Sequence, residues 1–214
     1  MEGLQKRPAT AVLVVAALMG LGAAACSPSR SQAAQPEVKA MPISPPPSRD
    51  LGKSFTAPLV DAKGKVIGDA VFTEGAHGLI IRLTAQPGKL TPGWHGLHLH
   101  EKADCADASA GFKASGKHAG HGDSVQHGFL APGGPEPGDL PNLFVAPKAP
   151  VGGEFVSTMA TLSNETQGGR IPLLDADGSA LIVHANPDDM KTQPVGNAGD
   201  RVACAAIPPA PSAP

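Results

Sequence analysis

Histidines are concentrated in one short part of the chain. Five of the eight lie between residues 98 and 127: His98, His100, His118, His121 and His127. Random scatter rarely produces such a cluster, and neutral imidazole is the commonest protein ligand for copper and zinc. The cluster therefore indicates a metal site.

The first two of these histidines stand two residues apart in Gly96-Leu97-His98-Leu99-His100. In a β-strand this spacing puts both imidazoles on one face, while Leu97 and Leu99 point into a core on the other. Two imidazoles on one strand face make a metal-binding geometry. The alternative is a polar outer face that happens to carry two histidines.

Two more histidines and a carboxylate follow on irregular sequence. His118 and His127 precede Asp139, and such a set of nitrogen and carboxylate ligands suits tetrahedral zinc. His184 stands alone after the apolar run 181–183. Its position alone favours a strand-end residue with an ordinary hydrogen bond over a ligand.

The elements that must position these residues are β-strands. Segments rich in β-branched or aromatic residues are separated by turn sequences such as Lys63-Gly64. Residues 106–141 have no regular pattern and are predicted to form a long loop, which in a compact domain is usually functional. Strands are predicted over 55–60, 66–72, 79–83, 96–100 and 180–184, the first three joined as hairpins.

Composition favours one domain of strands and turns. The 214 residues include 26 glycines and 23 prolines but no tyrosine, and 3% are aromatic. Such a composition excludes a bundle of long helices. The formal net charge is −2 and the only basic cluster is Lys6 with Arg7, so a nucleic-acid partner is excluded.

The N-terminus has the pattern of an export signal. Lys6 and Arg7 precede the apolar run 11–21, which is too short for a comfortable membrane span. Residues 1–25 are therefore expected to be removed.

Cys26 follows a run of small residues, as in bacterial lipoprotein signals, although Ala23 stands where those usually have leucine. Cys26 is expected to be lipidated. The alternative is an ordinary signal cleaved after Ala25, which leaves Cys26 as a thiol. Lipid on Cys26 is the only predicted attachment to a membrane. Ser27, in place of aspartate, favours the outer membrane, facing the bacterial periplasm.

The rest of the chain divides by composition. Residues 26–50 are rich in proline, serine and alanine and cannot bury a core, so they are interpreted as an extended tether. Residues 51–207 form the predicted folded domain. The proline-rich residues 208–214 form a disordered tail.

Two cysteines remain if Cys26 is lipidated. Cys105 and Cys204 then share an exported, oxidising compartment and are predicted to form a disulfide. It would close a loop of nearly the whole domain and stabilise it by about 4 to 5 kcal/mol in the chain-entropy estimate.

Three motifs, in order, carry a resemblance to a known family. They are residues 96–100 with Cys105 five residues later, GDLPNL at 138–143, and GNAGDRVAC at 196–204. In these motifs the chain resembles the copper/zinc superoxide dismutases in their bacterial exported form, over about residues 51–207. The resemblance implies an all-β fold: an eight-stranded Greek-key β-barrel, an immunoglobulin-like sandwich with long metal-binding and active-site loops.

The resemblance also implies one copper and one zinc ion per subunit. Asp188 resembles the carboxylate that links a copper-side histidine to a zinc-side one. Arg201 resembles the cation that draws superoxide to copper, and Cys105 with Cys204 matches the family disulfide. The implied copper ligands are His98, His100, His118 and His184, and the implied zinc ligands are His118, which bridges the two ions, His127 and Asp139.

The zinc motif departs from the family pattern at two places. Glu136 stands where the family has a third zinc histidine, and Ala119-Gly120-His121 replaces the usual residues after the bridging histidine. Three alternatives stay open: Glu136 completes the zinc site, His121 substitutes, or the site is weak or empty. A carboxylate in place of imidazole would make zinc less Lewis-acidic and His118 more basic.

The implied function is the conversion of superoxide to oxygen and hydrogen peroxide. Copper exchanges the electron, since zinc has no redox chemistry. Arg201 attracts the anion, and His118 releases copper and carries a proton. The rival functions are a lipid-tethered copper-binding module with little or no turnover, and a structural β-domain with incidental histidines. Monomer and homodimer both stay open, with Trp94 as the one large aromatic candidate for a contact.

Overall fold

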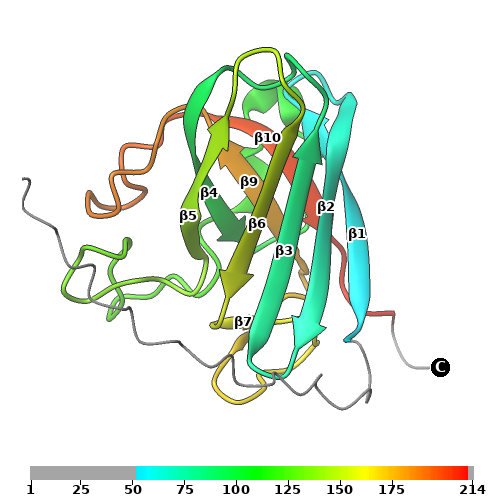
Figure 1. The fold of residues 1–214 in the computed structure, drawn as a ribbon. Coiled ribbons are helices and arrows are strands. Elements are labelled where there is room, and N and C mark those ends of the chain that lie inside the picture. Colours follow the sequence, from blue (N-terminus) through cyan, green and yellow to red (C-terminus); the bar gives the residue numbers. More distant parts are fainter. Residues whose placement is uncertain (1–51, 212–214) are drawn as a thin grey trace, which may run out of the picture. The chain divides into compact units, whose positions relative to one another are not determined.

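The computed structural model describes residues 52–211 (Figure 1). The predicted signal at 1–25, Cys26 with its tether, and the end of the predicted tail at 212–214 lie outside the described residues. Two 3-10 helices, η1 (Ala108–Ala110) and η2 (Lys113–Ser115), occur in the described part, and neither is long or apolar enough to cross a membrane.

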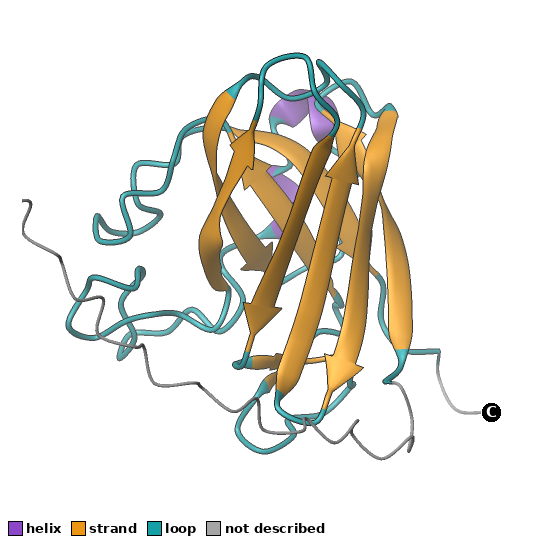
Figure 2. Cartoon of the chain, viewed as in Figure 1, coloured by secondary structure: helices purple, strands orange, loops and turns teal. Residues whose placement is uncertain are grey.

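Ten strands account for the regular structure of the described residues (Figure 2). Two of them, β7 (Ala160–Thr161) and β8 (Ile171–Pro172), form a short parallel pair. The other eight are β1 (Ser54–Asp61), β2 (Val66–Gly75), β3 (Gly78–Ala85), β4 (Gly93–His100), β5 (Asp139–Val145), β6 (Val151–Ser157), β9 (Ser179–His184) and β10 (Arg201–Ile207).

These eight strands form one antiparallel sheet in the order β5-β4-β9-β10-β1-β2-β3-β6. The end strands β5 and β6 contact each other, so the sheet curls into a nearly closed barrel (Figure 1). Neighbours that are distant in sequence, such as β3 with β6 and β1 with β10, mark the crossovers of a Greek key. The prediction of an all-β, eight-stranded barrel is confirmed.

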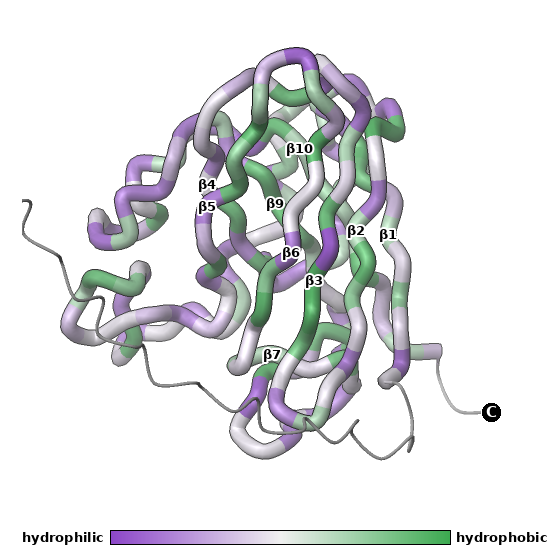
Figure 3. The backbone as a smooth tube through the Cα atoms, in the orientation of Figure 1, coloured by the Kyte–Doolittle hydropathy of each residue, from purple (hydrophilic) through white to green (hydrophobic). Residues whose placement is uncertain are grey.

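Alternation of side chains fixes the barrel interior. Along β3, Leu79, Ile81 and Leu83 are buried in the core, while Arg82 and Thr84 face outward. Ile80 also faces outward, so Figure 3 shows β3 as mainly apolar, with a hydrophilic stretch part-way along it. The pattern has the period of two that a strand with one buried face requires, and the predicted hairpins β1–β2 and β2–β3 are both present.

Strand β9 differs because both of its faces are buried. Leu181 and Val183 pack in the barrel core, whereas Ile182 packs on the other face against Phe112, in the loop after β4. This double cover explains why β9 is a continuous apolar run rather than an alternating one. Strand β4 has the same arrangement, with Leu97 and Leu99 in the core and histidines on the covered outer face.

Three strands of the barrel are not predicted from the sequence. Strand β5 contains Pro141, which is tolerated because β5 lies at one end of the strand order. Strand β6 begins with two glycines after Val151, and β10 is rich in alanine. The predicted loop 106–141 is wrong at its end, because Asp139 already pairs with β4 as the first residue of β5.

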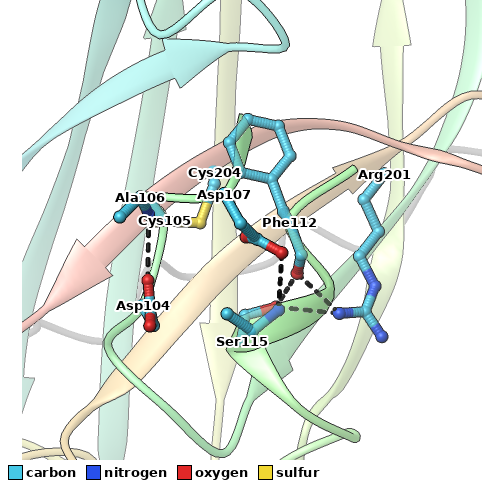
Figure 4. Close-up of a disulfide and its surroundings, with 9 residues drawn as sticks. Asp104, Cys105, Ala106, Asp107, Phe112, Ser115, Arg201 and Cys204 are labelled. Atoms are coloured by element: carbon cyan, nitrogen blue, oxygen red, sulfur yellow. Dashed lines mark hydrogen bonds between the residues drawn. A yellow bond between two sulfur atoms is a disulfide. The ribbon is translucent and has the colours of Figure 1, made fainter. Parts of the chain in front are cut away.

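The predicted disulfide is present. Cys105 and Cys204 are bonded, with their Cα atoms 5.8 Å apart and a separation of 99 positions in sequence. The bond ties the loop after β4 to the last strand, β10 (Figure 4). Phe112 and Ile182 pack around Cys204, so this part of the loop is held by both a covalent bond and an apolar cluster.

The contribution of the disulfide can be measured directly. We expect Cys105→Ala/Cys204→Ala to lose about 4 to 5 kcal/mol of unfolding free energy, because a disulfide that closes a loop of this length restricts the unfolded chain. Urea unfolding followed by circular dichroism tests this, with Cys26→Ser in both proteins to remove the third thiol. The parent treated with a reductant is the control and should match the variant. Equal stability of oxidised parent and variant would contradict the prediction.

Candidate metal centre

Strand pairing places the predicted site residues opposite one another. The second half of β4 lies between the start of β5 and β9, and the end of β9 pairs on its other side with the start of β10. The site residues on these strands, and the loop histidine that bridges to β4, therefore meet at one place. Directly opposite pairs are His98 with Asp139, His100 with His118, and His184 with Arg201.

Two long loops cover this place (Figure 2). Residues 101–138 connect β4 to β5, and residues 185–200 connect β9 to β10. The loops are bonded to each other: the Gln193 side chain accepts from the N–H of His127 (2.9 Å) and donates to its carbonyl (2.8 Å). The outer faces of β4 and β9 are thereby removed from solvent.

Four imidazoles converge beneath the loops. Their ligand atoms all lie within 4.8 Å of one another, and the four residues are buried. Each ring has one nitrogen that is buried and lacks a hydrogen-bond partner. Buried polar atoms are normally paired, so a shared metal ion is the natural partner for the set. The unpaired atoms are His98 Nδ1, His100 Nε2, His118 Nε2 and His184 Nε2.

The second nitrogen of each ring is held by the protein, which fixes the orientation of the first. Metal-binding histidines are commonly oriented by carbonyl or carboxylate groups in this way. The holding contacts are His98 Nε2 with the Asp188 carboxylate (2.8 Å), His100 Nδ1 with the Gly116 carbonyl (3.1 Å) and His184 Nδ1 with the Gly199 carbonyl (3.0 Å).

Burial keeps three of these histidines neutral. Removal from water lowers the pKa of His184 to about 3 and the pKa of His98 to about 4, the latter against the opposing effect of a neighbouring carboxylate. Burial, followed by neighbouring positive charge, holds the pKa of His100 well below its usual range. Neutral imidazole has the free lone pair that a metal ion needs.

A second group of candidate ligands shares His118. It comprises His98, His118, His127 and Asp139, although His98 is already engaged with Asp188. His118 Nδ1 lies 3.3 Å from Asp139 Oδ1, and His127 Nδ1 lies 2.7 Å from the same oxygen. One nitrogen of His118 therefore faces each group, which is the placement that the predicted bridging role requires.

Asp188 connects the two groups. One of its carboxylate oxygens lies 2.8 Å from His98 Nε2, and the other lies 3.1 Å from His127 Nε2. Burial alone would raise the pKa of Asp188, but its hydrogen bonds with these two histidines lower it. Asn142, in β5, fixes the Asp188 backbone through bonds of its side chain to both the N–H and the carbonyl.

Arg201 lies at the mouth of the site. Its guanidinium donates to the carbonyls of Phe112 and Gly116, 2.8 Å each, and to the Ser115 hydroxyl at 3.0 Å (Figure 4). A pocket of about 210 Å³ opens beside it. The pocket is lined by Lys117, His118, His121, Pro194, Val195 and Arg201. A small anion can therefore meet positive charge next to the four-imidazole group.

Comparison with known proteins gives the family. Residues 66–207 match the family described as copper/zinc superoxide dismutase. A protein of Caulobacter vibrioides named superoxide dismutase [Cu-Zn] is 46% identical over 154 residues, which cover 72% of this chain and 85% of the relative. The chain belongs to the copper/zinc superoxide dismutase family.

Further members of the superoxide dismutase family agree. Superoxide dismutase [Cu-Zn] 2 of Aquifex aeolicus is 36% identical, with 71% of this chain and 84% of the relative covered. The crystal structure of a SOD-like protein from Bacillus subtilis has a TM-score of 0.63 at 34% identity, covering 71% of this chain and 97% of the other. The Cu/Zn superoxide dismutase from Brucella abortus has a TM-score of 0.55 at 28% identity, covering 72% and 99%.

Two residues of this superoxide dismutase site were not anticipated. Asn142 belongs to the GDLPNL motif, but its bond to Asp188 joins positions 46 residues apart. Lys117 lines the pocket, where it adds a positive charge beside Arg201. His95 is buried near the site but does not belong to either group of candidate ligands: its ring nitrogens lie 2.6 and 2.8 Å from the backbone carbonyls of His184 and Thr91.

The link through Asp188 can be tested by Asp188→Asn. An amide has one acceptor oxygen, so it cannot accept from both histidines, and we expect the variant to hold metal about 10- to 100-fold more weakly. Competition with a chelator, followed by metal analysis, measures the change. Asp189→Asn is the matched control, because Asp189 bonds only within its own loop, to residues 191, 192 and 197. Equal metal retention in both variants would remove Asp188 from this role.

Proposed function

We propose that this protein is a superoxide dismutase that converts two superoxide radicals and two protons to oxygen and hydrogen peroxide. The observation that carries the proposal is the set of four buried, unpaired imidazole nitrogens beside a pocket that presents Arg201. Copper held by these imidazoles supplies the reversible one-electron exchange that the reaction needs.

The four-imidazole set fits copper in its donor chemistry. All of its donors are neutral nitrogens, which suit copper, and each ring is oriented through its other nitrogen. The proposed ligands are His98, His100, His118 and His184. Zinc is proposed on the other side of His118, where His127 and Asp139 supply the nitrogen and oxygen donors that zinc accepts.

Arg201 is proposed to bind and orient the substrate anion. Its guanidinium is fixed by carbonyls rather than by a carboxylate, so its charge is not neutralised by an ion pair. The chain as a whole has a net charge of −2, so attraction of an anion depends on local positive potential at the pocket. Lys117 adds a second positive charge to the lining.

His118 is proposed to hold and deliver a proton at Nε2. The residue lines the same pocket as Arg201, so a proton on this nitrogen is close to the bound anion. Its Nδ1 is held by carboxylates on the other side, which keeps the ring in place while Nε2 changes its partner. An imidazole in this position acts as both ligand and acid–base group.

We also propose that residues 1–25 are an export signal, that Cys26 carries lipid, and that residues 26–50 tether the domain 51–207, with 208–214 as a tail. Copper/zinc superoxide dismutases of bacteria are generally periplasmic. Attachment to the outer membrane through the lipid would place the enzyme where it meets superoxide in the cell envelope.

Turnover distinguishes this function from a copper-binding module without activity. We expect fast superoxide consumption, followed by stopped-flow absorbance, when the protein carries copper and zinc, because a fixed arginine beside the proposed copper ligands serves a substrate rather than storage. Protein loaded with copper alone tests whether zinc is needed, and metal-free protein is the control. Retention of copper with no turnover in either loaded form would support the copper-binding module instead.

Arg201→Ala should keep copper, since no contact joins the guanidinium to an imidazole ring in the described residues. We expect the rate to fall by about tenfold or more and its dependence on ionic strength to weaken. Arg82→Ala, an exposed position paired with Glu154 on the barrel wall, is the control. A variant with unchanged salt dependence would show that Arg201 does not attract the substrate.

A further inference from the structure

Glu136 is a buried carboxylate at a position where the family pattern has histidine. Its exposed fraction is 1%. Oε2 of Glu136 lies 2.8 Å from His118 Nδ1 and 3.9 Å from His127 Nδ1. Oε1 points the other way, to His121 Nδ1 at 2.5 Å. Oε2 of Glu136 therefore lies close to the same two histidine nitrogens that Asp139 faces.

Four donor atoms surround one point in this arrangement. The pairs that His118 Nδ1 and His127 Nδ1 form with Glu136 Oε2 and Asp139 Oδ1 are separated by 2.7 to 3.9 Å. Zinc bound tetrahedrally at 2.0 to 2.2 Å requires donors about 3.3 to 3.6 Å apart. The observed separations bracket that spacing, and two nitrogens with two carboxylate oxygens form a donor set that zinc accepts.

The backbone holds Glu136 in place. Its carbonyl accepts from the N–H of Asp139 (3.0 Å), and its N–H donates to Asp139 Oδ2 (2.9 Å). The same Oδ2 accepts from the N–H of Gly128 (2.7 Å). Oδ1 of Asp139 is left to face the histidines. One closed turn thus orients both carboxylates toward the same point.

The other departure from the family pattern, the segment Ala119-Gly120-His121, is in contact with the segment that carries Glu136. Strand β4 binds both segments through Leu99, whose carbonyl accepts from Ala119 and whose N–H donates to Gly138, 2.8 Å each. Gly120 packs on Pro137 so closely that a Cβ there would lie 2.5 Å from the proline Cγ. This contact requires glycine and brings His121 to the free oxygen of Glu136.

We infer that Glu136 Oε2 is the fourth ligand of zinc in this protein and that His121 is a positioning residue that holds Oε1. The inference rests on the proposed copper/zinc function only for the identity of the metal. Neither Glu136 nor His121 is a member of the two groups of candidate ligands described above. Glu136 Oε2 nevertheless lies within 3.9 Å of Nδ1 of both His118 and His127. The ring of His121, by contrast, is hydrogen-bonded only to Glu136 among the described residues, and about a third of its side chain (32%) is exposed. Relative to three histidines and one aspartate, this zinc site carries one more negative charge, so its ion withdraws less charge from His118.

Zinc affinity of the protein preloaded with one equivalent of Cu(II) tests the inference. Zinc is titrated in competition with a chromophoric chelator, and cobalt(II) is substituted to record the visible spectrum of the site. We expect Glu136→Gln to weaken zinc binding more than about 100-fold, beyond the range of an orienting residue. His121→Ala should weaken it by about 10- to 100-fold. Glu136→His, which restores the family residue, should bind zinc, with a cobalt spectrum different from that of the parent.

The control variant is Glu165→Gln, an exposed glutamate outside the site, which should bind zinc as the parent does. Circular dichroism of every variant establishes that the barrel is folded. Parent-like zinc affinity and cobalt spectrum in Glu136→Gln would overturn the inference. A larger loss of zinc affinity in His121→Ala than in Glu136→Gln would also overturn the inference, because it would make His121 the ligand. Copper retention and superoxide consumption are measured on the same samples. If the proposed function is wrong, the parent and all variants lack superoxide consumption alike, whereas failure of the inference about Glu136 shows only in the zinc titrations and cobalt spectra.

Discussion

The withdrawal of four imidazoles from water is the constraint on which the rest of the structure depends. A buried nitrogen without a hydrogen-bond partner is unfavourable. Four such nitrogens can face one another only because the other nitrogen of each ring is held by a hydrogen bond to the protein. The holding groups are two loop carbonyls, a buried aspartate, and the carboxylates beside His118. The loops that provide them also exclude solvent, so the same segments that orient the rings keep them neutral. The geometry of the proposed metal site therefore depends directly on the structure of the two loops.

The substrate pocket is built from the same parts. The Gly116 carbonyl accepts from the Arg201 guanidinium and also faces Nδ1 of His100. A shift of this one peptide would move both the proposed anion-binding group and a proposed copper ligand. The peptide is kept in place by its neighbours: Phe112 is fully buried, and the disulfide anchors the start of the loop to β10. The disulfide thus contributes to the geometry of the pocket as well as to stability.

Much of the site could be predicted from local sequence, and the remainder depends on contacts between distant segments. The spacing of His98 and His100 on a strand and the first three strands follow from short-range patterns, and the cysteine pair follows from the number of cysteines. Strands β5, β6 and β10 were not predicted, because their proline, glycine and alanine residues have low strand propensity. Burial in the barrel outweighs this low propensity. From its local sequence alone, His184 is predicted to be an ordinary residue at the end of a strand. Only the pairing of β9 with β4 places it beside the other imidazoles, with Nε2 as the unpaired nitrogen. The resemblance to the family supplied the roles of Asp188 and Arg201, which no local pattern indicates.

The site residues are spread from His98, in β4, to Arg201, in β10, well after the first strands of the domain. A chain that emerges from its N-terminal end has β4 early but lacks β10, which carries Arg201 and Cys204, until almost all of it is available. Because β10 lies between β1 and β9, the barrel cannot close without it. Completion of the proposed metal sites and of the anion pocket is therefore a late event, which follows the addition of the last strand to the barrel. A chain that lacks β10 has neither Arg201 nor Cys204, so it can form neither the anion pocket nor the disulfide, whatever the state of its histidines.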